Sequence, residues 1–375
     1  MSRDFVRSMP RAGTLPSTAA PRGIVPDPVL AILLAAVMAY GLVVLYSAIS
    51  AEVSVLQAQL VRLGLGVVVM LVLANLHPRL FLRWAPIVYL GGTALLVAVL
   101  FMGATVKGST RWLDLPLMPR FQPSEIMKIA VPMAVAWYLH DRPLPPSLKD
   151  VVVCLAIMGV PAGLIILQPD LGTGILVAAA GGLVIVLGGI RWRWIGATVL
   201  ALAAAAPILW QGLQGYQRQR ILTLFDPESD PLGAGWNIIQ STTAIGSGGV
   251  FGKGLFEGTQ SHLDFLPEAQ TDFIIAVIGE ELGLVGVVGL LILYLVLVGR
   301  SLYVSGTSPR TFDRLLAGAL TLTFFVYVFV NVGMVSGLLP VVGVPLPLIS
   351  YGGTSALTLL AGFGIVMSVY KHREW

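Results

Sequence analysis

Charged residues are scarce in this chain. Only 11% of its 375 residues are Asp, Glu, Lys or Arg, whereas 56% are hydrophobic. An ordinary soluble domain carries roughly a quarter charged residues, and its core could not absorb this much apolar surface. The scarcity of charge therefore excludes an ordinary soluble fold and indicates a membrane protein.

Cysteine and histidine are also nearly absent. Cys154 is the one cysteine, so no intrachain disulfide can form and the sequence carries no mark of a redox compartment. The four histidines are His77, His140, His262 and His372, and their spacing is not that of zinc ligands. Although the net charge is +4, the basic residues form no stripe or cluster, so no nucleic-acid partner is predicted.

Apolar runs of about twenty residues fill most of the chain, which is the length a helix needs to cross a hydrocarbon layer about 30 Å thick. The predicted fold class is all-α, a polytopic membrane protein with about ten transmembrane helices. The fourth and seventh spans are the weakest predictions, and the fourth is short and contains Lys128 and Pro132. The spans are placed at about 29–49, 58–76, 85–103, 123–140, 151–168, 172–190, 194–212, 273–299, 315–339 and 349–370.

The basic residues predict the orientation. Most of them fall on the inner segments if both termini are cytoplasmic, including those near Arg83, Arg142, Arg191 and Arg310. Residues 1–27 are rich in Pro, Ser and Arg without a signal-peptide pattern, and are expected to form a disordered cytoplasmic tail. Residues 28–375 are expected to form a single membrane domain.

One long polar loop, at about 213–272, is predicted on the outer face. A loop of this length is usually functional or disordered. Aromatic residues such as Trp236, Phe251 and Phe265 interleave with its glycines, so it contains enough apolar surface to fold back on the helices. We therefore expect an ordered lid, with a disordered loop as the alternative.

Ionisable residues inside spans cost about 3 kcal/mol each at mid-membrane, so each requires a partner, a water-filled cavity or a function. Glu125 and Lys128 are three residues apart, which places them on one helix face where they can pair. A buried structural ion pair is the equally weighted alternative to a functional couple.

A second acidic group lies where the outer loop enters the eighth span. Asp272 and Glu280 fall on roughly one helix face, whereas Glu281 points elsewhere. Arg62, in the outer half of the second span, is a candidate partner for one of these acids. An acid in the first turn of a helix is also favoured by the helix dipole, which gives Asp272 a purely structural interpretation.

Two glycine-containing segments invite other interpretations. The run from Gly246 to Gly254 lacks the spacing of a phosphate-binding loop, because Ser or Thr is required where Gly254 follows Lys253. The segment VPLPLISYGGTS, at 344–355, is a proline-stiffened approach to the last helix, and its glycines permit close backbone approach.

Three long segments stand out, RFQPSEIMK at 120–128, QSHLDFLPEAQTDFIIAVIGEELG at 260–283 and NVGMVSGLLPVVGVPLPLISYGGTSA at 331–356. Together they resemble the SEDS family, whose members act in shape, elongation, division and sporulation. The resemblance runs from the first predicted span to the last. Within the family, the segments at 217–241 and 258–268 are most similar to the rod shape-determining branch, and the division branch is the alternative.

This resemblance implies a peptidoglycan glycosyltransferase that polymerises lipid II, an undecaprenyl-diphosphate-linked disaccharide-pentapeptide, during cell elongation. It implies that the acid of the TDF motif, Asp272, is essential and that Glu125 and Lys128 are important for activity. Arg111 and Trp112 in STRWLD, with Arg218 and Arg220 in QRQR, are candidates for holding substrate.

The implied reaction joins an acceptor hydroxyl to a donor anomeric carbon while the diphosphate-lipid departs. An α-linked donor and a β-linked product require a single inverting displacement, with one base and positive charge for the leaving group. Asp272 is the predicted base, and Lys128, Arg111, Arg218 and Arg220 are the predicted cations. No cofactor is predicted with certainty, although a divalent cation is a candidate to share the neutralising role.

A lipid II flippase is the competing interpretation, because buried charges would equally line a translocation path. A scaffold that only recruits a transpeptidase is a third. The resemblance also implies partners, namely a class B penicillin-binding protein and the elongation machinery, and a location in the bacterial cytoplasmic (inner) membrane.

Overall fold

The computed structural model describes residues 23–106, 109–113, 121–230, 233–262 and 268–373. Helices dominate this part of the chain, and the one sheet within it is a two-stranded antiparallel hairpin. Residues 1–22 of the tail predicted at 1–27 lie outside the described residues.

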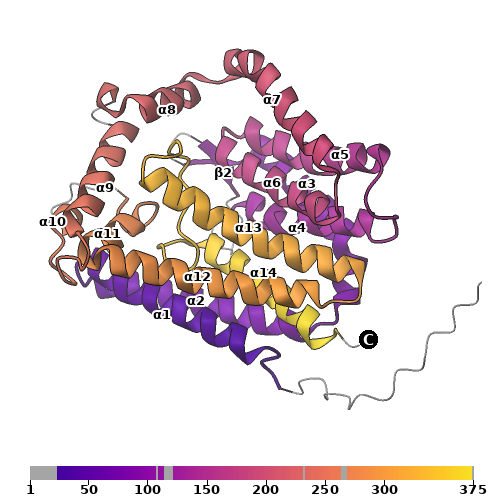
Figure 1. Ribbon diagram of the computed structural model, residues 1–375, viewed down its shortest axis with the longest axis horizontal. Coiled ribbons are helices and arrows are strands. Elements are labelled where there is room, and N and C mark those ends of the chain that lie inside the picture. The colour runs from indigo at the N-terminus through magenta and orange to yellow at the C-terminus, as the bar shows by residue number, and fades with distance from the viewer. Residues whose placement is uncertain (1–22, 107–108, 114–120, 231–232, 263–267, 374–375) are drawn as a thin grey trace, which may run out of the picture.

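Each of the ten predicted spans corresponds to helix in the structure (Figure 1). Seven of these helices, among the described residues, are long and apolar enough to cross a membrane, and α6 and part of α7 are shorter apolar helices. The all-α, multi-pass prediction is therefore confirmed. The helices of the spans are α1 (Pro28–Ala48), α2 (Val53–Asn75), α3 (Pro78–Met102), α4 (Pro123–Leu139), α5 (Leu148–Leu167), α6 (Leu171–Leu187), α7 (Trp192–Gly212), α11 (Ile274–Glu281), α12 (Gly283–Gly306), α13 (Thr311–Val335) and α14 (Thr354–Lys371).

Local sequence explains several helix starts. Pro28 and Pro123 occupy the first turns of α1 and α4, where a missing N–H breaks no hydrogen bond. Asp27 caps α1 by accepting from Leu30 N at 3.2 Å, and its other oxygen lies 3.0 Å from Arg300 Nε on α12. The cap of α1 therefore also joins the first helix to α12.

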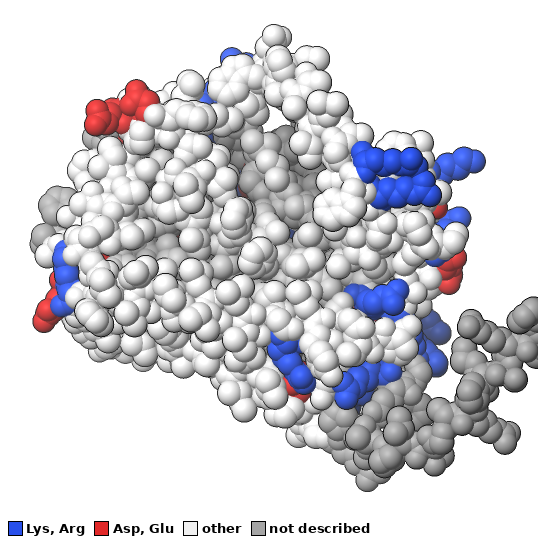
Figure 2. All heavy atoms as spheres, in the orientation of Figure 1, with Lys and Arg blue, Asp and Glu red and all other residues white. Residues whose placement is uncertain are grey.

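The centre of the bundle is formed by α4, α13 and α14, whose residues are mostly buried. Helix α2 packs along α14, and α3, α5 and α6 surround α4. Large apolar side chains on α1, α2, α3 and α7 are exposed, as expected for helices that face lipid. Figure 2 shows Lys and Arg gathered mainly toward the end of the molecule where the C-terminus lies, with few on the broad middle of the visible face.

The eighth predicted span is broken, which hydropathy did not predict. α11 ends at Glu281 and α12 begins at Gly283, whose φ of 66° is in the left-handed region. The glycine-rich run docks at this break: Lys253 N donates to Glu280 O at 3.0 Å, and Gly254 N donates to Glu281 O at 2.9 Å. These bonds satisfy carbonyls that a broken helix leaves without partners.

The described parts of the outer loop, residues 213–230, 233–262 and 268–272, form short helices and turns. Figure 1 shows α8 and α9 arching from the end of α7 back to α11. The elements of this loop and of the connection between α3 and α4 are β1 (Ala104–Val106), β2 (Ser109–Trp112), α8 (Gly215–Phe225), the 3₁₀ turn η1 (Pro227–Ser229), α9 (Ala234–Gly248) and α10 (Thr259–His262).

Candidate active site

The N-terminal turn of α4 carries a buried ion pair. Glu125 and Lys128 are each about 8% exposed, and Lys128 Nζ lies 2.6 Å from Glu125 Oε1. Their contact is the one that a three-residue helical spacing predicts. The ammonium also lies 4.8 Å from the centre of the Tyr327 ring on α13, a cation–π contact.

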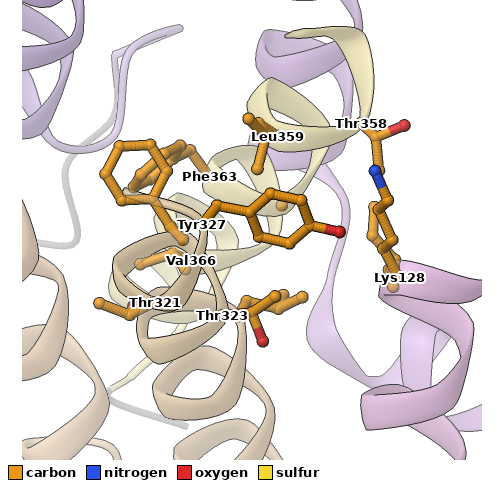
Figure 3. Close-up of a pocket in the computed structure, with 12 residues that line it drawn as sticks. Lys128, Thr321, Thr323, Tyr327, Thr358, Leu359, Phe363 and Val366 are labelled. Carbon is orange, nitrogen blue, oxygen red and sulfur yellow. The ribbon is translucent and has the colours of Figure 1, made fainter. Parts of the chain in front are cut away.

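Figure 3 shows the Tyr327 hydroxyl pointing toward Lys128, with Thr358 of α14 beside the lysine nitrogen. The apolar cavity next to this group has a volume of about 30 Å³, room for a water molecule or two.

A second ion pair joins the hairpin to α6. Arg111 Nη1 on β2 lies 3.2 Å from Asp170 Oδ2, and Gln122 Nε2 donates to the same oxygen at 3.2 Å. The other Asp170 oxygen caps α6 by accepting from Thr173 N. Asp170 is 5% exposed, so the guanidinium is held at the edge of the bundle by a buried carboxylate.

These two ion pairs line one cavity of about 150 Å³, which we call the Lys128 cavity. The cavity is surrounded by the hairpin, the starts of α4 and α6, the middle of α13 and the glycine-containing approach to α14. Its lining includes Arg111, Trp112, Gln122, Glu125, Lys128, Asp170, Tyr327, Gly343, Gly352 and Gly353.

A larger cavity of about 380 Å³, the Asp272 cavity, lies between α8, α9 and the start of α11. Asp272 comes just before α11, so its side chain is carried at the end of a buried helix. Arg220 enters this cavity from α8, with its guanidinium carbon 5.8 Å from the Tyr216 ring centre. Gly343 lines both cavities.

Gly343 marks the place where the carboxylate and the two cavities come together. Its φ of 75° favours glycine, and a Cβ there would lie 3.3 Å from Asp272 Oδ2. The Asp272 carboxylate therefore lies against a backbone position that has no side chain. That position, Gly343, lines both the Lys128 cavity and the Asp272 cavity.

Two of the sequence-based candidates occupy other positions. Arg218 is not among the described residues that line either cavity, and it donates instead to Trp210 O and Gln211 O at 3.0 and 2.6 Å, bracing α7 against α8. Among the described residues Arg62 contacts no acid, contrary to the prediction, and its guanidinium carbon lies 4.5 Å from the Tyr351 ring centre.

Glu280 and Glu281 hold the outer loop in place. Glu280 is fully buried, and its Oε1 accepts from Lys253 Nζ and Thr259 N, each at 2.7 Å. Ser47 Oγ donates to Glu281 Oε1 at 2.8 Å. The two acids thus make their hydrogen bonds at the break between α11 and α12, at the opposite end of α11 from Asp272.

Sequence reasoning missed Asp170, Tyr327 and Gly343. Asp170 carries a helix-cap signal, as an acid just before an apolar run, but nothing in the sequence indicates its contact with Arg111. Among the described residues, no group of three or more His, Cys, Asp and Glu side chains is arranged to hold a metal ion.

Comparison with known proteins places these features in a family. Residues 28–375 match the model of the FtsW, RodA and SpoVE cell cycle proteins. The chain is 52% identical to the peptidoglycan glycosyltransferase MrdB of Escherichia coli K12, covering 93% of this chain and 94% of that protein. It is 36% identical to the probable peptidoglycan glycosyltransferase FtsW of Trichlorobacter lovleyi, covering 92% of each.

Solved structures agree with this relationship. The rod shape determining protein RodA of Thermus thermophilus matches with a TM-score of 0.71 and 32% identity, over 93% of this chain and 98% of that one. A chain from a peptidoglycan synthase complex, described as coordinating polymerisation and crosslinking, matches with a TM-score of 0.81 and 35% identity, over 92% and 98%. The chain therefore belongs to the FtsW, RodA and SpoVE family of cell cycle proteins, the SEDS family.

Proposed function

We propose that this protein is a peptidoglycan glycosyltransferase that polymerises lipid II on the outer face of the cytoplasmic membrane during cell elongation. The high identity to MrdB over nearly the whole chain supports the activity and favours the elongation branch over the division branch. The observation that carries the mechanism is the position of Asp272 above Gly343, where the Lys128 and Asp272 cavities meet.

The cationic side of the site suits the leaving group. Lys128 and Arg111 line the Lys128 cavity, where they neutralise the diphosphate of the donor as it departs. Glu125 orients Lys128, and Asp170 orients Arg111. Trp112 lines the same cavity and offers an apolar surface to the donor. A divalent cation bound to the diphosphate would add to this neutralisation.

The larger side of the site suits the acceptor. Asp272 accepts the proton of the acceptor sugar hydroxyl as that oxygen attacks the donor anomeric carbon, and the bond to the diphosphate breaks. One displacement inverts the configuration, so no covalent enzyme intermediate is required. Arg220 lines the acceptor side and binds its anionic groups, whereas Arg218 braces the α7–α8 joint.

We also propose a membrane orientation and a partner. We place both termini in the cytoplasm, because the basic residues gather at the end of the bundle that carries the C-terminus. The match to a chain of a peptidoglycan synthase complex supports a class B penicillin-binding protein as the partner, within the elongation machinery.

A lipid II flippase is the competing function, and polymerisation without a membrane barrier separates the two. Purified protein in detergent, supplied with lipid II and no ion gradient, is expected to form glycan strands, and more of them when its co-purifying transpeptidase is present. Product formation in detergent cannot come from transport between two faces. Absence of strands under both conditions, together with lipid II translocation in vesicles, would favour the flippase.

A further inference from the structure

Asn331 is a buried amide that joins two segments of the proposed site. It lies on α13 with no exposed surface, and its Nδ2 donates to Asp272 O at 2.8 Å and to Val344 O at 2.7 Å. One acceptor belongs to the approach to α11, and the other to the proline-rich segment before α14. A single side chain on a central helix therefore fixes both.

The second acceptor, Val344 O, is next in sequence to the glycine that the Asp272 carboxylate lies against. Val344 follows Gly343, the residue whose missing Cβ leaves space 3.3 Å from Asp272 Oδ2. Asn331 thus bonds to the backbone of Asp272 and to the backbone of Val344, which follows the glycine that the Asp272 carboxylate lies against. The two hydrogen bonds therefore tie the backbone of Asp272 to the segment that its carboxylate lies against.

Neighbouring bonds hold the adjacent residues but leave this role to Asn331. Ser350 Oγ donates to Thr271 O, and Tyr351 N donates to Gln270 O at 2.8 Å. These contacts align residues 270 and 271 with the approach to α14. The Asn331 amide bonds to the carbonyl of Asp272 itself.

We propose that Asn331 is a positioning residue that sets where the Asp272 carboxylate lies relative to the junction of the two cavities. This inference rests on the proposed role of Asp272 as the general base. Displacing a reacting group by about 1 Å can lower a rate by about 100-fold. Loss of the two hydrogen bonds is therefore expected to lower kcat while leaving substrate binding nearly unchanged.

A merely structural Asn331 would behave differently. It would satisfy two buried carbonyls, and its replacement would lower thermal stability without changing the turnover of the protein that remains folded. Turnover per folded molecule is thus the quantity that separates positioning from structural support.

The experiment compares Asn331→Leu and Asn331→Asp in the purified full-length protein, with lipid II as substrate. Leu is close in size and removes both donors. A buried, neutral Asp keeps one O–H donor and is nearly isosteric with Asn. Asn331→Asp is therefore the variant to measure if the Leu variant does not fold. Ser301→Ala on α12 is the control, because it removes a buried hydroxyl bonded only to Leu297 O of its own helix.

We expect Asn331→Leu to lower kcat by about 10-fold to 100-fold, with KM within about twofold of the wild-type value. Asn331→Asp should lie between Leu and the wild type, and Ser301→Ala should keep the wild-type kcat. Wild-type kcat in both folded Asn331 variants would overturn the inference, as would a rise in KM alone.

Asp272→Asn, measured in the same assay, separates this inference from the proposed function. If Asp272→Asn polymerises at the wild-type rate, the role of Asp272 as base is wrong. If Asp272→Asn is impaired while the Asn331 variants keep full kcat, the base stands and only the positioning role fails.

Discussion

Arg111 and Asp170 form an ion pair, with Arg111 Nη1 3.2 Å from Asp170 Oδ2, that connects the outer hairpin to the first turn of α6. The carboxylate is nearly buried, whereas the Arg111 side chain is one third exposed at the cavity edge. This is the arrangement expected of a cation that is oriented by the protein and offered to an anion.

Asp170→Asn should therefore weaken substrate binding. Asn keeps the shape and the cap of α6 but removes the charge that orients Arg111, so we expect KM for lipid II to rise by about tenfold, which corresponds to about 1.4 kcal/mol. Steady-state polymerisation by purified protein measures this. Asp141→Asn is the control, because that side chain is exposed and lines neither cavity among the described residues. An unchanged KM in Asp170→Asn would show that the pair does not serve the substrate.

Single and double substitutions of Glu125 and Lys128 should affect folding and activity differently. Removing one partner leaves a buried charge uncompensated, at about 3–5 kcal/mol, so Glu125→Gln and Lys128→Met should each reduce activity strongly. The double variant should recover folding, shown by gel filtration, but not activity, because the diphosphate still lacks Lys128. Lys149→Met, at an exposed residue in the first turn of α5, is the control. Full activity of both single variants at normal expression would reduce the pair to a dispensable contact.

The two arginines of α8 should give different defects. Arg220→Met removes a cation from the Asp272 cavity, so we expect a higher KM and little change in thermal stability. Arg218→Met removes two bonds to the end of α7, so we expect a lower unfolding temperature. Measuring KM and unfolding temperature for both variants tests this assignment, and it fails if the two defects are exchanged.

The proposed topology is open to chemical labelling. Single cysteines at the positions of Arg83, Arg142, Arg191 and Arg310, in a Cys154→Ala background, should resist an impermeant thiol reagent in intact cells. A cysteine at Ser229, which is exposed in the outer loop, should react. The opposite labelling pattern would invert the orientation and place Asp272 on the cytoplasmic side.

Helices were predictable from the sequence because each apolar run has its own length and hydropathy, and the contact between Glu125 and Lys128 was predictable because it is local. The contacts between helices were not predictable from the sequence. Asp170 with Arg111, and Asn331 with Asp272, depend on how the spans pack, which hydropathy does not encode. The break at Leu282 was missed for a related reason, since it depends on the glycine-rich run docking there.

Asp272→Asn provides the most direct test of the mechanism, because Asn keeps the shape and hydrogen-bonding capacity of the side chain but cannot accept the proton. The measurement is lipid II polymerisation by Asp272→Asn protein that gel filtration shows to be folded. We predict that the rate falls by about 10² to 10⁴, the usual contribution of a general base, and that Asp272→Glu retains part of the activity. Near wild-type polymerisation by Asp272→Asn would contradict the account and remove Asp272 from the mechanism.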